Sequence, residues 1–173
     1  MEKGQRRILI SQDEIKRRVT ELGGELSEDY KDQKPLVIGI LRGGFIFTAD
    51  LVRAMDITLE VDFLTTSSYN HGFESTGNVN ILQDVRTQVR ERDVILVDDI
   101  MDSGNTLKVV KERLLAAGAN SVKICVMLDK PERRTESITP DYVAFEIPDV
   151  FIVGCGLDYG DYYRNVPYIY TYE

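Results

Sequence analysis

The 173-residue chain has little cysteine, a single histidine and no excess of basic residues. Its cysteines, Cys125 and Cys155, each lie in an apolar run, which favours reduced core thiols over a disulfide. Neither has the cysteine or histidine neighbours that a metal site would need. Acidic residues outnumber basic ones by 29 to 21, for a net charge of −8. General binders of nucleic acid or membrane surfaces need a basic face, so neither kind of partner is expected.

A long apolar segment is also missing from the N-terminal residues, MEKGQRRILIS. We therefore expect no signal peptide or membrane span there, and the cytoplasm is the expected location. The hydrophobic content of 43% is ordinary for a globular protein. The length suits one domain whose core needs no disulfide.

The first clear element is an amphipathic helix that follows a short apolar strand at residues 8–10. Ser11 and Glu14 have the spacing of a capping box at its start. The apolar side chains on one helical face are Ile15, Val19, Leu22 and Leu26. Two glycines, Gly23 and Gly24, predict that this helix loosens or ends early.

Apolar runs then alternate with helical patterns, which indicates an α/β fold with a parallel sheet. The predicted strands are residues 36–41, 59–64, 79–82, 94–99 and 122–128. Helices are predicted at 45–55 and from Thr106 to Gly118. Ligands of such sheets bind at the carboxyl ends of the strands, so the loops after Leu41, Leu64, Asp99 and Leu128 are the candidate site.

The segment 94–107, VILVDDIMDSGNTL, carries the strongest chemical signal. Asp98 and Asp99 end a buried strand, and Asp102 stands in the turn beyond. Ser103 to Thr106 open a helix whose free N–H groups and positive dipole end suit a phosphate. The acids need a different ligand, and ribose hydroxyls and Mg²⁺ are suitable. The alternative is that the acids cap the loop and Ser103 is only a turn residue.

Residues 97–107 resemble the phosphoribosyl diphosphate signature of the type I phosphoribosyltransferases. From about Ile8 to Tyr170 the chain is similar to the hypoxanthine (hypoxanthine-guanine) phosphoribosyltransferase family. The motifs that carry this resemblance are LRGG at 41–44, SSYNHGFESTG at 67–77, DKPERR at 129–134 and the segment 148–170. The resemblance implies a mainly parallel sheet flanked by helices within a single domain, 1–173. Its core would span about 36–145, and a small hood would come from about 1–12 and 146–173.

The same resemblance implies a purine salvage activity. The enzyme would transfer the 5-phosphoribosyl group of phosphoribosyl diphosphate to N9 of hypoxanthine, and of guanine, giving IMP or GMP and pyrophosphate. Mg²⁺ is the implied cofactor, and a homodimer or homotetramer is the implied assembly.

Roles follow by position in the motifs. Asp102 would be the base that faces the purine N7 proton. Asp98 and Asp99 would hold the ribose hydroxyls, directly or through Mg²⁺, although the family more often has Glu at the first position. The 5′-phosphate would be held by Ser103, Gly104, Asn105 and Thr106.

The pyrophosphate would meet Arg42, Gly43 and Arg164, with a cis peptide bond expected between Leu41 and Arg42. Asp158 would ligate a second Mg²⁺. Taken alone, the glycines after Arg42 could be a tight turn, Asp158 a loop acid and Arg164 a surface charge.

The purine would meet three residues. Lys130 would donate to its 6-oxygen, Phe151 would stack on its face, and the backbone of Ile152 would bond its edge. Ser68 and Tyr69 would belong to a lid. The alternatives are an exposed loop lysine at 130 and a buried strand at 150–153.

Two other functions remain open. A related enzyme would act on xanthine, adenine, uracil or orotate, and Lys130 and the Phe151 segment argue against the last three. A non-catalytic regulator would sense phosphoribosyl diphosphate and bind DNA or RNA, but the acidic balance and short length speak against it.

Overall fold

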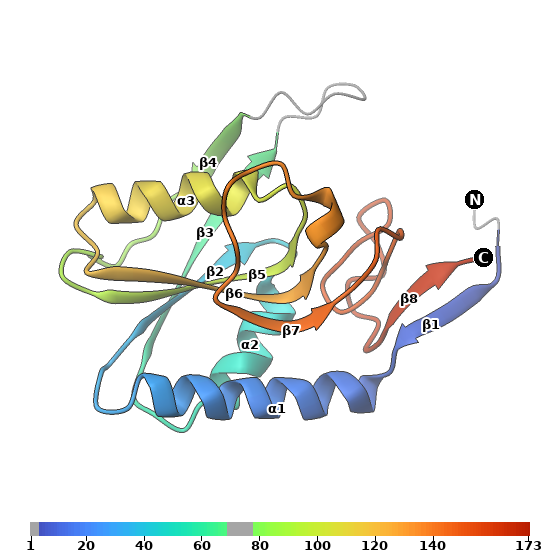
Figure 1. Cartoon of the computed structure of the whole chain (residues 1–173), viewed down its shortest axis with the longest axis horizontal. Coiled ribbons are helices and arrows are strands. Elements are labelled where there is room, and N and C mark those ends of the chain that lie inside the picture. The colour runs from blue at the N-terminus through green and yellow to red at the C-terminus, as the bar shows by residue number, and fades with distance from the viewer. Residues whose placement is uncertain (1–3, 69–77) are drawn as a thin grey trace.

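The central element is a six-stranded sheet, seen in a computed structural model that describes residues 4–68 and 78–173 (Figure 1). Its strands, in spatial order, are β4 (Val79–Gln83), β3 (Glu60–Ser68), β2 (Leu36–Leu41), β5 (Asp93–Met101), β6 (Ser121–Asp129) and β7 (Tyr142–Glu146). Neighbouring strands pair in parallel, except β3 with β4. The predicted α/β class with a mainly parallel sheet is confirmed.

Helices cover both faces of the sheet, with α1 (Gln12–Asp29) and α2 (Phe45–Arg53) on one side and α3 (Asn105–Ala116) on the other (Figure 1). Alternate side chains of a strand point to opposite faces, and the core divides accordingly. Residues packed with α1 and α2 include Val37, Ile95 and Met127, and those packed with α3 include Ile38, Leu96 and Val126. The carboxyl ends of the central strands are thereby held at one edge of the sheet.

Helix α1 begins as predicted but does not end early. The Ser11 hydroxyl accepts from the Glu14 N–H at 3.2 Å, and the Glu14 carboxylate accepts from the Ser11 N–H at 2.7 Å. The helix continues to Asp29, so the expected loosening at the two glycines is wrong. A Cβ on Gly23 would lie 2.5 Å from the Cβ of Ala54, at the end of α2. Gly23 therefore serves close packing between the helices.

A second, two-stranded sheet joins the two ends of the chain. Its strands are β1 (Arg6–Ile10) and β8 (Ile169–Tyr172), which run antiparallel (Figure 1). Between β7 and β8 the chain is irregular, with isolated bridges that join Val153 to Tyr170, Gly154 to Leu157 and Tyr159 to Tyr162. This segment meets the loop after β2, because a Cβ on Gly156 would lie 2.2 Å from the Gly43 carbonyl oxygen.

A short 3-10 helix, η1 (Pro131–Arg133), follows β6 and begins the connection to β7. Within residues 4–68 and 78–173, none of the helices is long and apolar enough to span a bilayer.

Candidate active site

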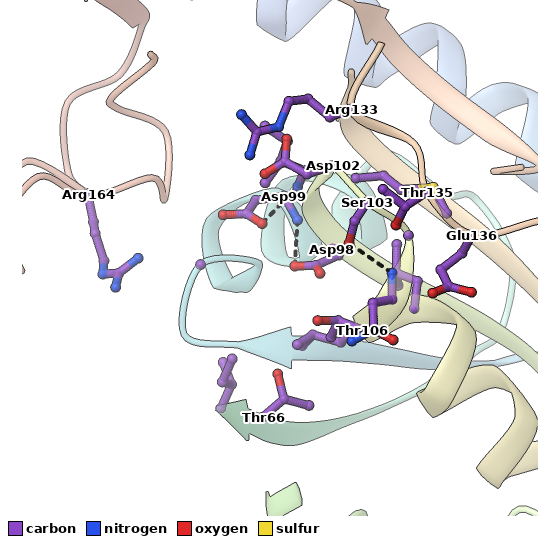
Figure 2. Close-up of a pocket in the computed structure, with 18 residues that line it drawn as sticks. Thr66, Asp98, Asp99, Asp102, Ser103, Thr106, Arg133, Thr135, Glu136 and Arg164 are labelled. Carbon is purple, nitrogen blue, oxygen red and sulfur yellow. Dashed lines mark hydrogen bonds between the residues drawn. The ribbon is translucent and has the colours of Figure 1, made fainter. Parts of the chain in front are cut away.

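A cavity of about 880 Å³ opens at the carboxyl ends of β2 and β5. The predicted site residues that line it are Gly43, Asp98, Asp99, Asp102, Ser103, Gly104, Asn105, Thr106 and Arg164. Figure 2 shows the acids and the turn of α3 on one side, with Arg164 reaching in from another segment. Residues far apart in the sequence are thus brought to one site, as expected for the switch region of a parallel sheet.

Two adjacent carboxylates lie near the carboxyl end of strand β5, which continues two residues past the predicted end, to Met101. The Asp98 carboxylate accepts from the Asp99 N–H at 2.9 Å, and the Asp99 carboxylate accepts from the Ile100 N–H at 2.7 Å. Burial raises the pKa of Asp98 well above its usual range, and the neighbouring Asp99 charge raises it further. Burial also raises the pKa of Asp99, although hydrogen bonds and the Arg164 charge oppose that effect. Such a pair favours a ligand that supplies positive charge or hydroxyl donors.

Among the described residues, neither carboxylate has a salt-bridge partner, and no group of three or more His, Cys, Asp or Glu could by itself hold a metal ion. Mg²⁺ commonly binds one or two carboxylates together with substrate oxygens and water. Asp98 and Asp99 fit that donor set, since burial and mutual repulsion leave their negative charge in need of a cation.

The turn between β5 and α3 has the form of a phosphate cradle. Gly104 has a φ of 87°, in the left-handed region, and a Cβ there would lie 2.7 Å from the side chain of Ile138. The Ser103 hydroxyl accepts from the Asn105 N–H at 3.2 Å, so a hydrogen bond within the turn fixes the start of α3. The helix dipole places its positive end at this opening.

The loop after β2 packs directly on the acids. The Leu41–Arg42 peptide bond is cis, as expected. A Cβ on Gly43 would lie 2.2 Å from Oδ2 of Asp99, so any larger residue there would displace the Asp99 carboxylate. The Gly44 N–H donates to the Ile40 carbonyl at 3.0 Å, so the loop is also a tight turn. Arg42 is exposed and does not line the cavity, so the structure does not bring its side chain to the acids.

Lys130 does not line the cavity but lies beside the proposed base, Asp102. It is 8% exposed, so the interpretation as an exposed loop lysine is wrong. Its Nζ atom lies 4.0 Å from Oδ1 of Asp102 and 3.9 Å from Oδ1 of Asp149. The Asp102 Oδ1 atom is itself buried, with no hydrogen-bond partner in the part of the chain that the structure describes. Sequence reasoning did not single out Asp149, which lies within the 148–170 motif.

The purine-pocket segment is not the strand that its composition suggests. Residues 150–153 form no strand apart from the bridge of Val153, and Phe151 is 54% exposed. The Phe151 ring meets Tyr159 edge to face, with centroids 5.6 Å apart. Because Phe151 stays largely exposed despite this contact, much of its ring surface is accessible, which suits stacking on a planar base. Ile152 is buried, and neither residue lines the main cavity.

Arg164 is tied to its own segment rather than free at the surface. Its Nη1 atom donates to the Gly156 carbonyl at 2.6 Å, and its Nη2 atom lies 3.6 Å from Oδ1 of Asp158. Asp158 also accepts from the Asp161 N–H at 3.0 Å and does not line the cavity. Its proposed metal role stays a prediction.

Most of the predicted lid, residues 67–77, lies outside the residues that the structure describes. Ser68 is the last residue of β3 and pairs with Val79, while Tyr69 lies outside the described residues. Polar residues that line the cavity but were not predicted are Thr66, Arg133, Thr135 and Glu136. Arg133 belongs to the DKPERR motif, whereas the other three have no such signal.

Known proteins resemble the chain over almost all of its length. A family described as phosphoribosyl transferase domain matches residues 10–160. The chain is 47% identical over 163 residues to a hypoxanthine-guanine phosphoribosyltransferase of Bacillus subtilis, covering 94% of this chain and 91% of the relative. It is 48% identical over 169 residues to that of Lactococcus lactis, covering 98% and 92%. A crystal structure of a hypoxanthine phosphoribosyltransferase from Staphylococcus aureus matches with a TM-score of 0.93 and 41% identity, covering 96% and 91%.

Proposed function

The chain belongs to the phosphoribosyltransferase family, and we propose that it is a purine salvage enzyme that makes IMP from hypoxanthine and GMP from guanine. Phosphoribosyl diphosphate is the donor, and pyrophosphate is the second product. The observation that carries this proposal is the position of Asp102. It lines the cavity together with Asp98 and Asp99, and its Oδ1 atom lies 4.0 Å from Nζ of Lys130, which does not line the cavity.

Phosphoribosyl diphosphate fits the cavity in one direction. Ser103 to Thr106 take the 5′-phosphate at the start of α3, and the ribose hydroxyls donate to Asp98 and Asp99. Both carboxylates lie in the same cavity as that turn. The pyrophosphate then lies toward Gly43 and Arg164, where a guanidinium offers a matched charge.

The base is recognised by Lys130, Phe151 and Ile152. The Lys130 ammonium is a donor only, so it pairs with a 6-oxo group and not with a 6-amino group. The exposed Phe151 ring stacks on the purine, and the backbone of Ile152 bonds the base edge. Adenine is therefore expected to be a poor substrate.

Transfer breaks the bond from C1′ to the pyrophosphate oxygen and forms the bond from C1′ to purine N9. The electron pair of the broken bond leaves with pyrophosphate, and positive charge develops on the ribose ring. Arg164 stabilises the charge that grows on pyrophosphate. Asp102 accepts the N7 proton as N9 attacks, a contribution of about 10²–10⁴-fold for general bases.

Mg²⁺ is the proposed cofactor, held by Asp98 and Asp99 together with substrate oxygens, with Asp158 as the proposed ligand of a second ion. When bound, it neutralises negative charge on the ribose diphosphate. The raised pKa values of Asp98 and Asp99 support this assignment.

The remaining assignments are also proposals. Ser68 and Tyr69 belong to a lid that excludes water. The single domain has a core of about 36–145 and a hood of about 1–12 and 146–173, which the pairing of β1 with β8 supports. We expect a cytoplasmic homodimer or homotetramer.

The direct test measures IMP and pyrophosphate together after mixing the protein with hypoxanthine, phosphoribosyl diphosphate and Mg²⁺. Equal amounts of both products, lost on chelation with EDTA and restored by added Mg²⁺, are expected. Pyrophosphate without IMP would mean hydrolysis and would contradict transfer to the base.

A further inference from the structure

A buried ion pair links the end of β6 to the turn that carries Asp102. Asp129 is the last residue of β6, and its Oδ1 atom accepts from Nη2 of Arg134. The two side chains are only 10% and 13% exposed. Neither lines the cavity, so the pair is placed to hold the site and not to contact a ligand.

The other nitrogens of Arg134 bind backbone carbonyls. Its Nε atom donates to the Asp102 carbonyl at 3.1 Å, and its Nη1 atom donates to the Ile138 carbonyl at 3.1 Å. One planar guanidinium therefore meets three acceptors from three parts of the chain. A lysine ammonium lacks this rigid fork and cannot replace all three bonds.

Arg134 also packs against the turn between β5 and α3 that would hold the phosphate. Its Cδ atom lies 3.1 Å from the position of a Cβ on Gly104. The next two residues, Thr135 and Glu136, both donate their N–H groups to the Ser103 carbonyl at 3.1 Å. The two carbonyls that follow the Asp102 side chain, those of Asp102 and Ser103, are thus fixed by the segment that Arg134 begins.

This support matters because little else holds the Asp102 carboxylate. Its Oδ1 atom accepts no hydrogen bond from the described residues, and its nearest charge partner, Lys130, is 4.0 Å away. The direction of the carboxylate is then set mainly by its own backbone. A misplacement of about 1 Å can cost about 100-fold in rate.

We propose that Arg134 is a positioning residue that aims Asp102 at the N7 proton of the purine, and that Asp129 holds Arg134 in place. The proposal rests on the proposed function, since it gives Asp102 the role of base. It adds two residues that touch no substrate but set the rate of transfer.

The test is a double-mutant cycle on kcat with hypoxanthine, using wild type, Arg134→Lys, Asp102→Asn and the double variant. Arg134→Lys is expected to lower kcat by at least about tenfold, with less than about a threefold change in KM for hypoxanthine. In the Asp102→Asn background the same change is expected to lower kcat by less than about threefold, because the group that it positions is already disabled. Losses that multiply, or a loss confined to KM, would overturn the proposal.

Arg113→Lys is the matched control, because Arg113 forms an exposed pair with Asp84 at 2.6 Å, away from the cavity. It should leave kcat unchanged. Calorimetric titration with phosphoribosyl diphosphate counts the folded sites in every variant, so kcat is given per folded site.

A second variant covers the case in which Arg134→Lys does not fold. Asp129→Asn keeps an oxygen acceptor for Arg134 but removes the charge. We expect it to lower kcat less than Arg134→Lys does, and to show the same non-additivity when it is combined with Asp102→Asn. Unchanged kcat in Asp129→Asn would remove Asp129 from the proposal. A wild-type protein that forms no IMP would instead contradict the proposed function, so the two failures are distinguishable.

Discussion

The Nζ atom of Lys130 lies 4.0 Å from the Oδ1 atom of Asp102. That distance is too long for a hydrogen bond but short enough for electrostatic attraction. The carboxylate oxygen is buried and accepts no hydrogen bond from any described residue. It is therefore available to accept a proton from a bound purine, while the ammonium beside it is available to a 6-oxygen.

Replacing Asp102 with Asn should abolish the proton transfer but leave the shape of the site. We expect Asp102→Asn to lower kcat by about 10²–10⁴-fold, with a much smaller change in KM for hypoxanthine. Steady-state kinetics with both substrates measure this. Asp32→Asn, at an exposed position outside the cavity, is the control. A wild-type kcat in Asp102→Asn would remove Asp102 from the mechanism.

Replacing Lys130 with Gln should weaken the choice between oxo and amino purines. The amide carries both a donor and an acceptor, so it can also accept from a 6-amino group. We expect kcat/KM for hypoxanthine to fall at least about tenfold, and the ratio of adenine to hypoxanthine use to rise. Parallel assays of the two bases measure the ratio, with Lys31→Gln at an exposed position as control. An unchanged ratio would assign the selectivity to another residue.

Removing the charge of Asp98 should stabilise the ligand-free protein at neutral pH. Burial, followed by the Asp99 charge, raises the pKa of Asp98 above its unfolded value. Below the unfolded pKa of about 3.9 both states bind the proton, and the group costs nothing. As pH rises through the folded pKa, the unfolded state has already released its proton, so stability is lost. The melting temperature of Asp98→Asn should therefore exceed that of wild type at pH 7, by about 2–4 °C for each kcal/mol of stabilisation.

Thermal melts of wild type and Asp98→Asn from pH 4 to pH 8 measure this difference, which should vanish at the acidic end. Asp62→Asn is a control of opposite sign. Burial raises the pKa of Asp62, but N–H donors from Thr87, Phe63 and Arg86 together lower it. Its contribution is present above the unfolded pKa, so Asp62→Asn should melt below wild type at pH 7. A pH-independent difference for Asp98→Asn would contradict the account of its burial.

Two neighbouring glycines of α1 should respond to alanine in opposite ways. At Gly23 a Cβ would lie 2.5 Å from the carbonyl oxygen of Ala54, whereas nothing lies within 4 Å of a Cβ at Gly24. Gly24→Ala should stabilise the protein by about 0.5–1 kcal/mol, because alanine favours the helix. Gly23→Ala should destabilise the protein, because the backbone at Ala54 would have to move to make room for the new methyl group. Urea unfolding of both variants measures the difference, and a stabilising Gly23→Ala would contradict the packing of α1 on Ala54.

Much of the sheet could be predicted because buried parallel strands are uninterrupted apolar runs. The strand 36–41 was predicted with the bounds that the structure gives it. Strands β7 and β8 were missed, since each is short and lies at a sheet edge or in the two-stranded sheet. The opposite error occurred at 150–153, where an apolar run forms no strand and leaves Phe151 exposed. Composition alone does not separate a buried strand from an aromatic side chain that faces a ligand.

The candidate site likewise has residues that could be predicted from the sequence and residues that could not. Asp98 to Thr106 could be located because strand end, turn and helix start are contiguous in the sequence. Asp149 and Arg134 could not be assigned their contacts, because their partners Lys130 and Asp102 are brought to them by the fold. Arg42 was expected among the cavity residues, but the backbone of its loop lies at the acids and its side chain is exposed.

The most direct test measures nucleotide formation from hypoxanthine, guanine, xanthine and adenine, each with phosphoribosyl diphosphate and Mg²⁺, in wild type and Asp102→Asn. The account predicts IMP and GMP from wild type, at least about 100-fold less of both from Asp102→Asn, and no product with adenine. The rate with xanthine shows how this third oxopurine compares with hypoxanthine and guanine as a substrate. No nucleotide from any base, with phosphoribosyl diphosphate still bound, would contradict the account and favour a non-catalytic regulator.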